Sequence, residues 1–229
     1  MAQEWWKKFS IEEWVNHKKV GATFWITRAD KSQAVDYYRR ISDRYNEVAE
    51  TGFLELLRRT ERKAVVALSD FKKAGTLIDV GCGGGYYALR AKDAGMRVTV
   101  IDVSKEMVGR LEGKVDEIGV ADIEDLTVTK MFDRVICAGV LDFVFRPEVA
   151  LMNLFRLARP GGKVILLVPR KGIGGEVYRI EKNLTGFDAN LFALDWLENF
   201  ASHNQMKMVN FTYPLPHNLA VVFRKLPNF

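Results

Sequence analysis

The sequence predicts an α/β protein whose core is a mostly parallel sheet with an antiparallel strand near its C-terminal end. From residue 76 onward, short apolar runs alternate with helical patterns, which is typical of parallel βαβ units with right-handed crossovers. The runs lie at residues 76–80, 97–102, 119–122, 132–138 and 163–169. The last two strand candidates, 206–213 and 219–225, are separated by a segment too short for a crossover helix. We therefore expect an antiparallel hairpin, with 206–213 parallel to the core strands.

Length and composition indicate a globular chain of one domain with an elaboration. The chain has 229 residues, of which 48% are hydrophobic and 28% charged, as is ordinary for soluble proteins. We find no signal-peptide pattern and no apolar run near the ~20 residues of a membrane span. The two cysteines, Cys82 and Cys137, have no partner at metal-ligand spacing. We therefore expect reduced thiols, a cytoplasmic location and no metal site.

The basic character of the chain has a local origin. The formal net charge is +5 and the isoelectric point is about 9.1. The surplus of basic residues lies before residue 74, in pairs such as Lys7-Lys8 rather than in one long run. Such pairs are explained by solvated helix faces. Binding of an anionic substrate, a membrane surface or nucleic acid is the alternative explanation. The diffuse charge makes nucleic acid the less favoured partner.

Residues 1–73 are predicted to form an N-terminal helical extension or cap in front of a core at 74–229. The extension holds four of the five tryptophans, and a capping-box signal at Ser10 begins a short amphipathic helix. Its aromatic face either packs on the body of the protein or makes a peripheral membrane contact. Two further helices are expected over about 32–50 and 53–71. They cover the site or form an outer layer of the sheet.

The stretch 76–85, T-L-I-D-V-G-C-G-G-G, predicts a ligand site. Glycines after a buried strand mark a tight turn into a helix, where backbone and helix N-terminus can approach a bound anion. Asp102 ends the second strand, near the offset of about 20 residues at which an acid binds ribose hydroxyls. Gly83, Gly85 and Ala88 also satisfy the G-x-G-x-x-A form of the dinucleotide fingerprint. On these residues alone, a nicotinamide-dependent or flavin-dependent enzyme is an equally allowed interpretation.

Five motifs then follow one another along the core. They are L-I-D-V-G-C-G-G-G at 77–85, V-T-V-I-D-V-S at 98–104, A-D-I-E-D-L at 121–126, F-D-R-V-I-C-A-G-V-L-D-F-V at 132–144 and L-A-R-P-G-G-K-V-I-L-L-V-P at 157–169. In this order they resemble the class I S-adenosylmethionine-dependent methyltransferases. The resemblance implies a Rossmann-like, doubly wound, mostly parallel seven-stranded sheet with a C-terminal antiparallel hairpin strand. It also implies an N-terminal helical cap and a substrate-cover insertion near 171–190.

The resemblance implies S-adenosylmethionine as the cofactor and assigns roles by position. Asp79 would approach the methionine ammonium, Asp102 would bind both ribose hydroxyls, and Val103 would pack on the adenine. Asp122 and the next backbone amide would read the adenine edge, and the Ala138 carbonyl would lie near the ammonium. Strand-end caps are the alternative interpretation of the acids. The full expected set of cofactor-binding residues is Tyr45, Asp79, Gly81, Cys82, Gly83, Gly85, Asp102, Val103, Met107, Asp122, Ile123 and Ala138.

The candidate catalytic residues are His217, Tyr37 and Asp142. A methyl displacement mostly requires positioning, and a general base is needed only for a hydroxyl acceptor. His217 follows a strand whose end is expected at the carboxyl edge of the sheet, so it is either a base or a plain turn histidine. Asp142 stands where the family often has histidine or glutamate, and Tyr37 belongs to a helix that covers the methionine end or packs in the core. Tyr178 and the loop 171–175 would form the substrate cover.

The sequence therefore predicts an enzyme that transfers a methyl group from S-adenosylmethionine to an oxygen or nitrogen of a small-molecule, aromatic or anionic acceptor. An RNA methyltransferase is the alternative within the class. A nicotinamide-dependent oxidoreductase and a binding protein that holds the cofactor without turnover are alternatives from other classes. The oligomeric state is left open between monomer and homodimer.

Overall fold

The computed structural model describes residues 52–127, 130–184, 188–215 and 217–227, and the structural statements below concern these residues. The helices predicted before residue 51 lie outside them, as do two predicted site residues, Tyr37 and Tyr45. The helix expected over 53–71 is present as α4 (Gly52–Ser69).

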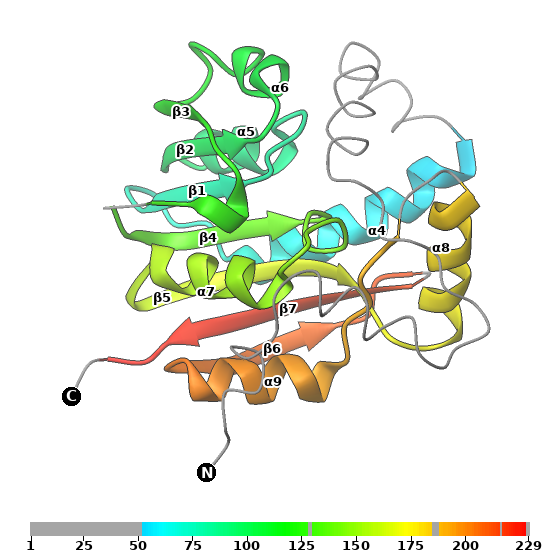
Figure 1. Cartoon of the computed structure of the whole chain (residues 1–229). Helices are drawn as coiled ribbons and strands as arrows, with labels where there is room; N and C mark the ends of the chain where they lie inside the picture. Colours follow the sequence, from blue (N-terminus) through cyan, green and yellow to red (C-terminus); the bar gives the residue numbers. More distant parts are fainter. Residues whose placement is uncertain (1–51, 128–129, 185–187, 216, 228–229) are drawn as a thin grey trace.

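The core is a seven-stranded sheet with the strand order β3-β2-β1-β4-β5-β7-β6 (Figure 1). Its strands are β1 (Thr76–Val80), β2 (Arg97–Asp102), β3 (Glu117–Val120), β4 (Phe132–Ala138), β5 (Ala158–Pro169), β6 (Met206–Thr212) and β7 (Asn218–Lys225). Strands β1 to β5 are parallel, whereas β7 is antiparallel to both of its neighbours, β5 and β6. Strand β6 therefore points in the same direction as β1 to β5. The predicted Rossmann-like sheet and its antiparallel hairpin strand are confirmed.

Two strands begin earlier than the sequence predicts. Strand β3 begins at Glu117 rather than 119, and its side chains alternate between half-buried and exposed, so it lacks the continuous apolar run of a central strand. Strand β5 begins at Ala158 rather than 163. Its first residues include the exposed Gly161, whose φ of 77° belongs to a turn. The apolar run begins only after this turn, which is why the pattern placed the start of the strand later.

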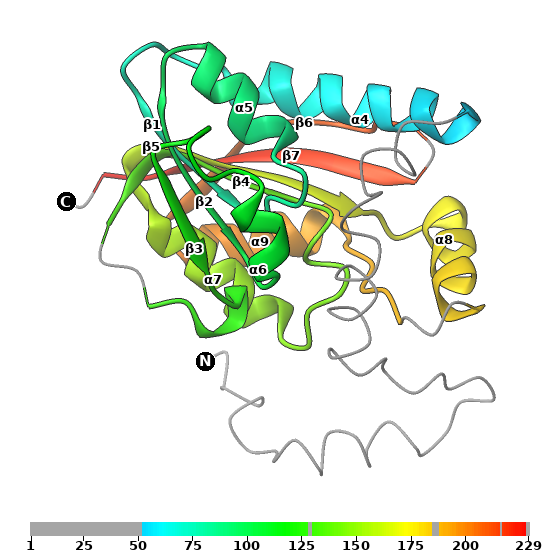
Figure 2. The same ribbon diagram turned by 90° about the horizontal axis from the view of Figure 1, so that it is seen from above.

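Helices cover both faces of the sheet (Figure 2). Helices α4 and α5 (Tyr86–Asp93) pack on one face, and α7 (Pro147–Leu157) and α9 (Leu194–His203) pack on the other. Strand β1 is buried on both sides: Leu77 packs in one apolar cluster, and Ile78 and Val80 pack in the other. In both views α8 (Ile173–Leu184) lies beyond the carboxyl ends of the central strands, next to the beginning of α4.

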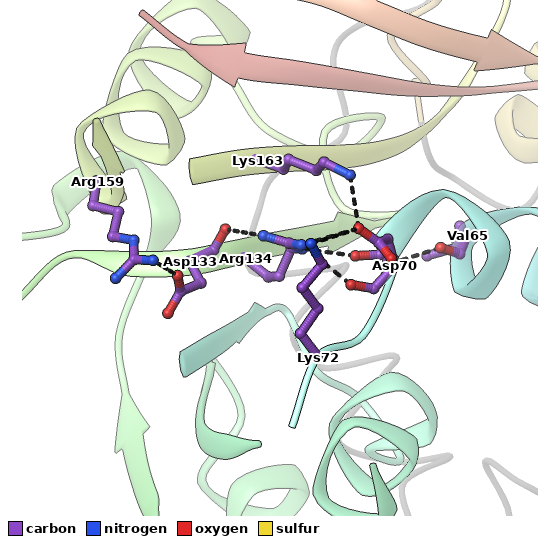
Figure 3. Close-up of polar contacts among 8 residues, drawn as sticks. Val65, Asp70, Lys72, Asp133, Arg134, Arg159 and Lys163 are labelled. Atoms are coloured by element: carbon purple, nitrogen blue, oxygen red, sulfur yellow. Dashed lines mark hydrogen bonds and ion pairs between the residues drawn. The ribbon is translucent and has the colours of Figure 1, made fainter. Parts of the chain in front are cut away.

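A cluster of charged residues closes the opposite, amino-terminal edge of the sheet (Figure 3). Arg134, at the start of β4, is 7% exposed and donates from Nε to the Ser69 carbonyl at 2.7 Å. Its Nη2 donates to the Asp70 carbonyl at 3.2 Å, and Lys163 of β5 donates to the Asp70 carboxylate at 3.2 Å. These contacts of the amino-edge cluster (Asp70, Asp133, Arg134, Arg159 and Lys163) fasten the end of α4 across β4 and β5.

Candidate active site

The loop between β1 and α5 turns tightly because three of its glycines have left-handed backbone angles. The φ angles of Gly81, Gly83 and Gly85 are 72°, 49° and 78°. A Cβ at Gly81 would overlap Val140, and a Cβ at Gly85 would overlap Leu111. Packing around the loop therefore already requires glycine at both positions. This loop lies at the carboxyl edge of the sheet, where ligands bind in open α/β folds.

Asp102 fastens the glycine loop to the end of β2. Its Oδ2 accepts from the Gly83 amide at 2.9 Å, and its Oδ1 accepts from the Ser104 amide at 2.9 Å. Burial raises the pKa of Asp102, and these amide hydrogen bonds oppose the rise. The sequence placed this acid beside the loop, and the structure adds that its carboxylate holds the loop directly. Its predicted contact with the ribose hydroxyls stays a prediction.

Asp79 is a buried acid at the end of β1. Its side chain is 1% exposed, and its Oδ2 accepts no hydrogen bond within the described part of the chain. Burial raises the pKa of Asp79 to about 7, the Asp102 charge adds to the rise, and a backbone hydrogen bond from Ala88 opposes it. A buried oxygen without a donor is costly. A cationic group of a ligand is the partner that this carboxyl chemically suits.

The expected adenine side lies around β2 and the short helix η3 (Ile123–Asp125). Val103 is 42% exposed, which leaves an apolar surface beside Asp102. Asp122 caps η3, since its Oδ1 accepts from the Glu124 amide at 2.9 Å. Glu124 was not predicted. Its buried carboxylate accepts from the backbone amides of Phe145 (3.2 Å) and Arg146 (2.8 Å), which ties η3 to the segment that follows β4.

Three other predicted cofactor contacts are mostly enclosed by the protein. Met107 is 1% exposed, Ile123 is 6% exposed and Cys82 is 7% exposed, so their side chains belong to the apolar core. Ala138, at the end of β4, is only partly buried. Burial also raises the pKa of the Cys82 thiol, which keeps it protonated. Contacts of these four residues with a cofactor stay predictions.

The structure brings together the acceptor-side residues that it describes. The Tyr178 hydroxyl of α8 donates to Asp142 Oδ2 at 2.8 Å. The Tyr178 ring stacks on His217, with 4.2 Å between ring centroids and 18° between ring planes. Asp142 is 2% exposed, and burial raises its pKa to about 6. Burial lowers the pKa of His217, which therefore stays neutral near pH 7. We call Asp142, Tyr178 and His217 the acceptor-side cluster.

Two residues beside this cluster were missed. Asn218, at the start of β7, donates from Nδ2 to Glu61 Oε1 of α4 at 2.6 Å. Burial raises the pKa of Glu61, and the negative charge of Asp142 adds to the rise. Glu61 lies four residues after Leu57 and four before Val65, so it interrupts the apolar face of the predicted helix. A charge on that face is the signal that could have identified it.

The described residues hold no group of three or more histidine, cysteine, aspartate or glutamate side chains that could bind a metal. Across the same ranges, no helix is both long and apolar enough to cross a membrane.

The fold and this site define a class: a doubly wound α/β domain that presents a glycine loop, a strand-end acid and buried carboxyls at one sheet edge. Residues 78–166 match the methyltransferase domain family. The predicted resemblance to methyltransferases is thus confirmed for the core.

Curated relatives share mainly this core. Ubiquinone biosynthesis O-methyltransferase from Xanthomonas oryzae pv. oryzae is 37% identical over 98 residues, which are 39% of this chain and 41% of that protein. Phosphatidylethanolamine N-methyltransferase from Cereibacter sphaeroides is 28% identical over 138 residues, which are 56% of this chain and 66% of that protein. The chain thus matches less than two thirds of the length of each relative.

Solved structures share the fold over most of the chain. Magnesium protoporphyrin IX methyltransferase from Synechocystis, solved with bound S-adenosylhomocysteine, has a TM-score of 0.69 at 20% identity and covers 86% of this chain and 100% of its own. The [4+2]-cyclase SpnF has a TM-score of 0.67 at 18% identity, with 89% and 99% coverage. Because the second protein is named a cyclase, likeness of fold alone does not determine the reaction.

Proposed function

We propose that the protein is a methyltransferase that transfers a methyl group from S-adenosylmethionine to an oxygen or nitrogen of a small molecule. The observation that carries the proposal is Asp79, a buried acid with an unpartnered oxygen beside a tight glycine loop, inside the region that matches the methyltransferase family. Solved relatives that bind S-adenosylmethionine or S-adenosylhomocysteine on the same fold support this choice of cofactor.

The residues present fit such a cofactor. Asp79 supplies a carboxyl for the methionine ammonium, and Asp102 supplies carboxylate oxygens for the ribose at the end of β2. Exposed Val103 offers an apolar face for the adenine, beside the η3 turn that Asp122 caps. The glycines of the tight turn carry no side chains, so that backbone of this loop can lie close to a bound cofactor.

The bound cofactor supplies a methyl group on a positively charged sulfur, which a nucleophile displaces directly. The contribution of the chain is to hold the acceptor in line with the methyl carbon and to keep water away. The acceptor-side cluster and Glu61 lie at the carboxyl edge with the glycine loop, since Asp142 follows β4 and His217 precedes β7. Burial raises the pKa of Tyr87 in α5, and the negative charges of Asp79 and Glu61 add to the rise.

The relatives suggest acceptor classes to test. One is named for ubiquinone synthesis and methylates oxygen, and another is named for phosphatidylethanolamine and methylates nitrogen. We infer that the acceptor of this chain is likewise a small organic molecule or a lipid headgroup rather than RNA. The absence of an Asn/Asp-Pro-Pro-Tyr signature after β4, where the chain reads C-A-G-V, agrees with this inference.

The test uses the full chain and methyl-labelled S-adenosylmethionine with a cell extract separated into small-molecule, lipid and RNA fractions. Label in the first two fractions supports the proposal, and label confined to RNA contradicts it. Thermal unfolding gives a second readout, because a ligand that binds the native state raises the melting temperature. S-adenosylhomocysteine should raise it and NAD should not. A rise with NAD alone would support an oxidoreductase instead.

A further inference from the structure

Tyr178 is the side chain by which α8 reaches the acceptor side of the site. Its hydroxyl donates to Asp142 Oδ2 at 2.8 Å, and its ring stacks on His217. The apolar residues of the same helix face outward: Ile173, Val177, Ile180 and Leu184 are between 57% and 88% exposed. A tyrosine fixed at both its ring and its hydroxyl has little freedom to change rotamer, so it sets the position of the carboxyl it contacts.

Asp142 is held firmly, yet one of its oxygens lacks a partner. Its backbone carbonyl accepts from the Asn190 amide at 2.8 Å, and the Asn190 side chain donates to the carbonyls of Leu141 (3.0 Å) and Val144 (2.8 Å). Its Oδ2 is occupied by Tyr178, whereas Oδ1 accepts no hydrogen bond from the residues that the structure describes. A buried acceptor left unpaired costs about 1–3 kcal/mol. Such an atom in a fixed carboxyl points to a donor that a ligand brings.

We propose that Tyr178 is a positioning residue that holds Asp142 so that Oδ1 takes the proton of a hydroxyl acceptor. This inference rests on the proposed methyltransferase function and narrows it to O-methylation. The oxygen–hydrogen bond of the acceptor breaks as a bond from hydrogen to Asp142 Oδ1 forms. The acceptor oxygen forms a bond to the methyl carbon, the carbon–sulfur bond breaks, and the sulfur keeps the electron pair. Asp142 then returns the proton to solvent. A neutral amine has no such requirement before attack.

The groups around Asp142 set the pH at which it can act. Burial is the largest effect on the pKa of Asp142 and raises it to about 6. The hydrogen bonds from Tyr178 of α8 and from the backbone amide of Asp142 itself lower it, as does the charge of Lys182 of α8. Glu61 faces Asp142 from α4, and Cys137 faces it from β4. The ionised form accepts a proton, so methyl transfer should rise with pH through about 6. Removing the Tyr178 hydroxyl should move this rise to higher pH.

The experiment compares the full-length wild type with Tyr178→Phe, Asp142→Asn and the matched control Tyr213→Phe. Tyr213 is 46% exposed and lies under Arg170, outside the cluster. The first readout needs no acceptor: ¹³C NMR follows the titration of aspartate carboxyls. We expect a carboxyl that titrates near pH 6 in the wild type, disappears in Asp142→Asn and moves up by about one pH unit in Tyr178→Phe. Tyr213→Phe should titrate as the wild type.

The second readout is methyl transfer from labelled S-adenosylmethionine to the metabolite extract, and to catechol as a defined hydroxyl probe. Asp142→Asn should lose about a hundredfold or more in rate at every pH, and Tyr178→Phe should recover as the pH is raised to 8. Unchanged titration in Tyr178→Phe, or wild-type transfer by Asp142→Asn, would overturn the inference, as would label found only on amines. No transfer by the wild type, with the NMR shifts as expected, would instead count against the proposed function.

Discussion

Cofactor affinity should depend on pH through Asp79. Its pKa lies near 7 in the folded protein, mainly because of burial, whereas the usual aspartate value is 3.8. The free protein therefore carries this group mostly protonated below neutral pH. A methionine ammonium pairs with the ionised form. Binding at low pH must then release a proton, which weakens the apparent affinity.

The size of the effect follows from the ionised fraction. For a pKa of about 7, roughly one tenth of Asp79 is ionised at pH 6 and roughly nine tenths at pH 8. The affinity for S-adenosylhomocysteine should therefore be about tenfold lower at pH 6 than at pH 8, a difference of about 1.4 kcal/mol in the free energy of binding. Calorimetric titration with S-adenosylhomocysteine in two buffers of different ionisation enthalpy measures both the affinity and the proton release. Adenosine, which lacks the amino-acid part, is the matched control ligand and should bind equally at both pH values.

The same shift has a consequence for stability. Because the folded state binds this proton more tightly than the unfolded chain, the contribution of Asp79 to the free energy of unfolding falls as pH rises from about 4 to about 7. Asp79→Asn should stabilise the unliganded protein at pH 8 and abolish the pH dependence of binding. An affinity ratio between S-adenosylhomocysteine and adenosine that stays constant from pH 6 to pH 8 would refute the reasoning.

Three further outcomes test the scaffold. Gly85→Ala should lower the free energy of unfolding by about 2 kcal/mol or more, because the new Cβ would overlap Leu111. The control Gly113→Ala has a similar φ of 74° but nothing within 4 Å of the new Cβ, so it should lower the free energy of unfolding by only about 1 kcal/mol. Equal losses in denaturant titrations would contradict the packing argument. Asp102→Asn should abolish the thermal shift caused by S-adenosylhomocysteine while the protein stays folded by circular dichroism, and an unchanged shift would mean that the ribose assignment is wrong. Arg134→Met should cost about 2 kcal/mol in urea titration, since the Ser69 carbonyl loses its buried donor, with no change in cofactor affinity; a parallel loss of affinity would show that the two edges are coupled.

The central strands and the glycine loop could be predicted because their signals are local. The strand before Gly81 is buried on both faces of the sheet and its buried residues are apolar except for Asp79, and the glycines have backbone angles that few other residues tolerate. Edge strand β3 gave a weaker pattern, so its start was misplaced. His217 was expected at the carboxyl edge from strand direction, whereas Asp142 was selected from the resemblance to the methyltransferases.

What the sequence left out depends on contacts between distant residues. The hydrogen bond from Asn218 to Glu61 joins positions 157 residues apart, and that from Lys163 to Asp70 joins positions 93 apart. The periodicity of apolar residues in the sequence does not predict such long-range pairings. The stacking of Tyr178 on His217 likewise needed the packing of α8 against the turn before β7. The burial of individual side chains could not be predicted from sequence position either. Met107 follows β2 and was expected to contact the cofactor, yet its side chain is buried in the core.

The amino-edge cluster bears on how such a protein can acquire new acceptors. Helix α4 is fastened through Asp70 and Arg134 at the edge opposite the site, while Glu61, earlier along the same helix, lies on the acceptor side. Substitutions near Glu61 and along α8 therefore change the proposed acceptor surface while the contacts of Asp70 and Arg134 stay in place. Divergence in substrate choice can proceed on this scaffold while its folding determinants are inherited unchanged.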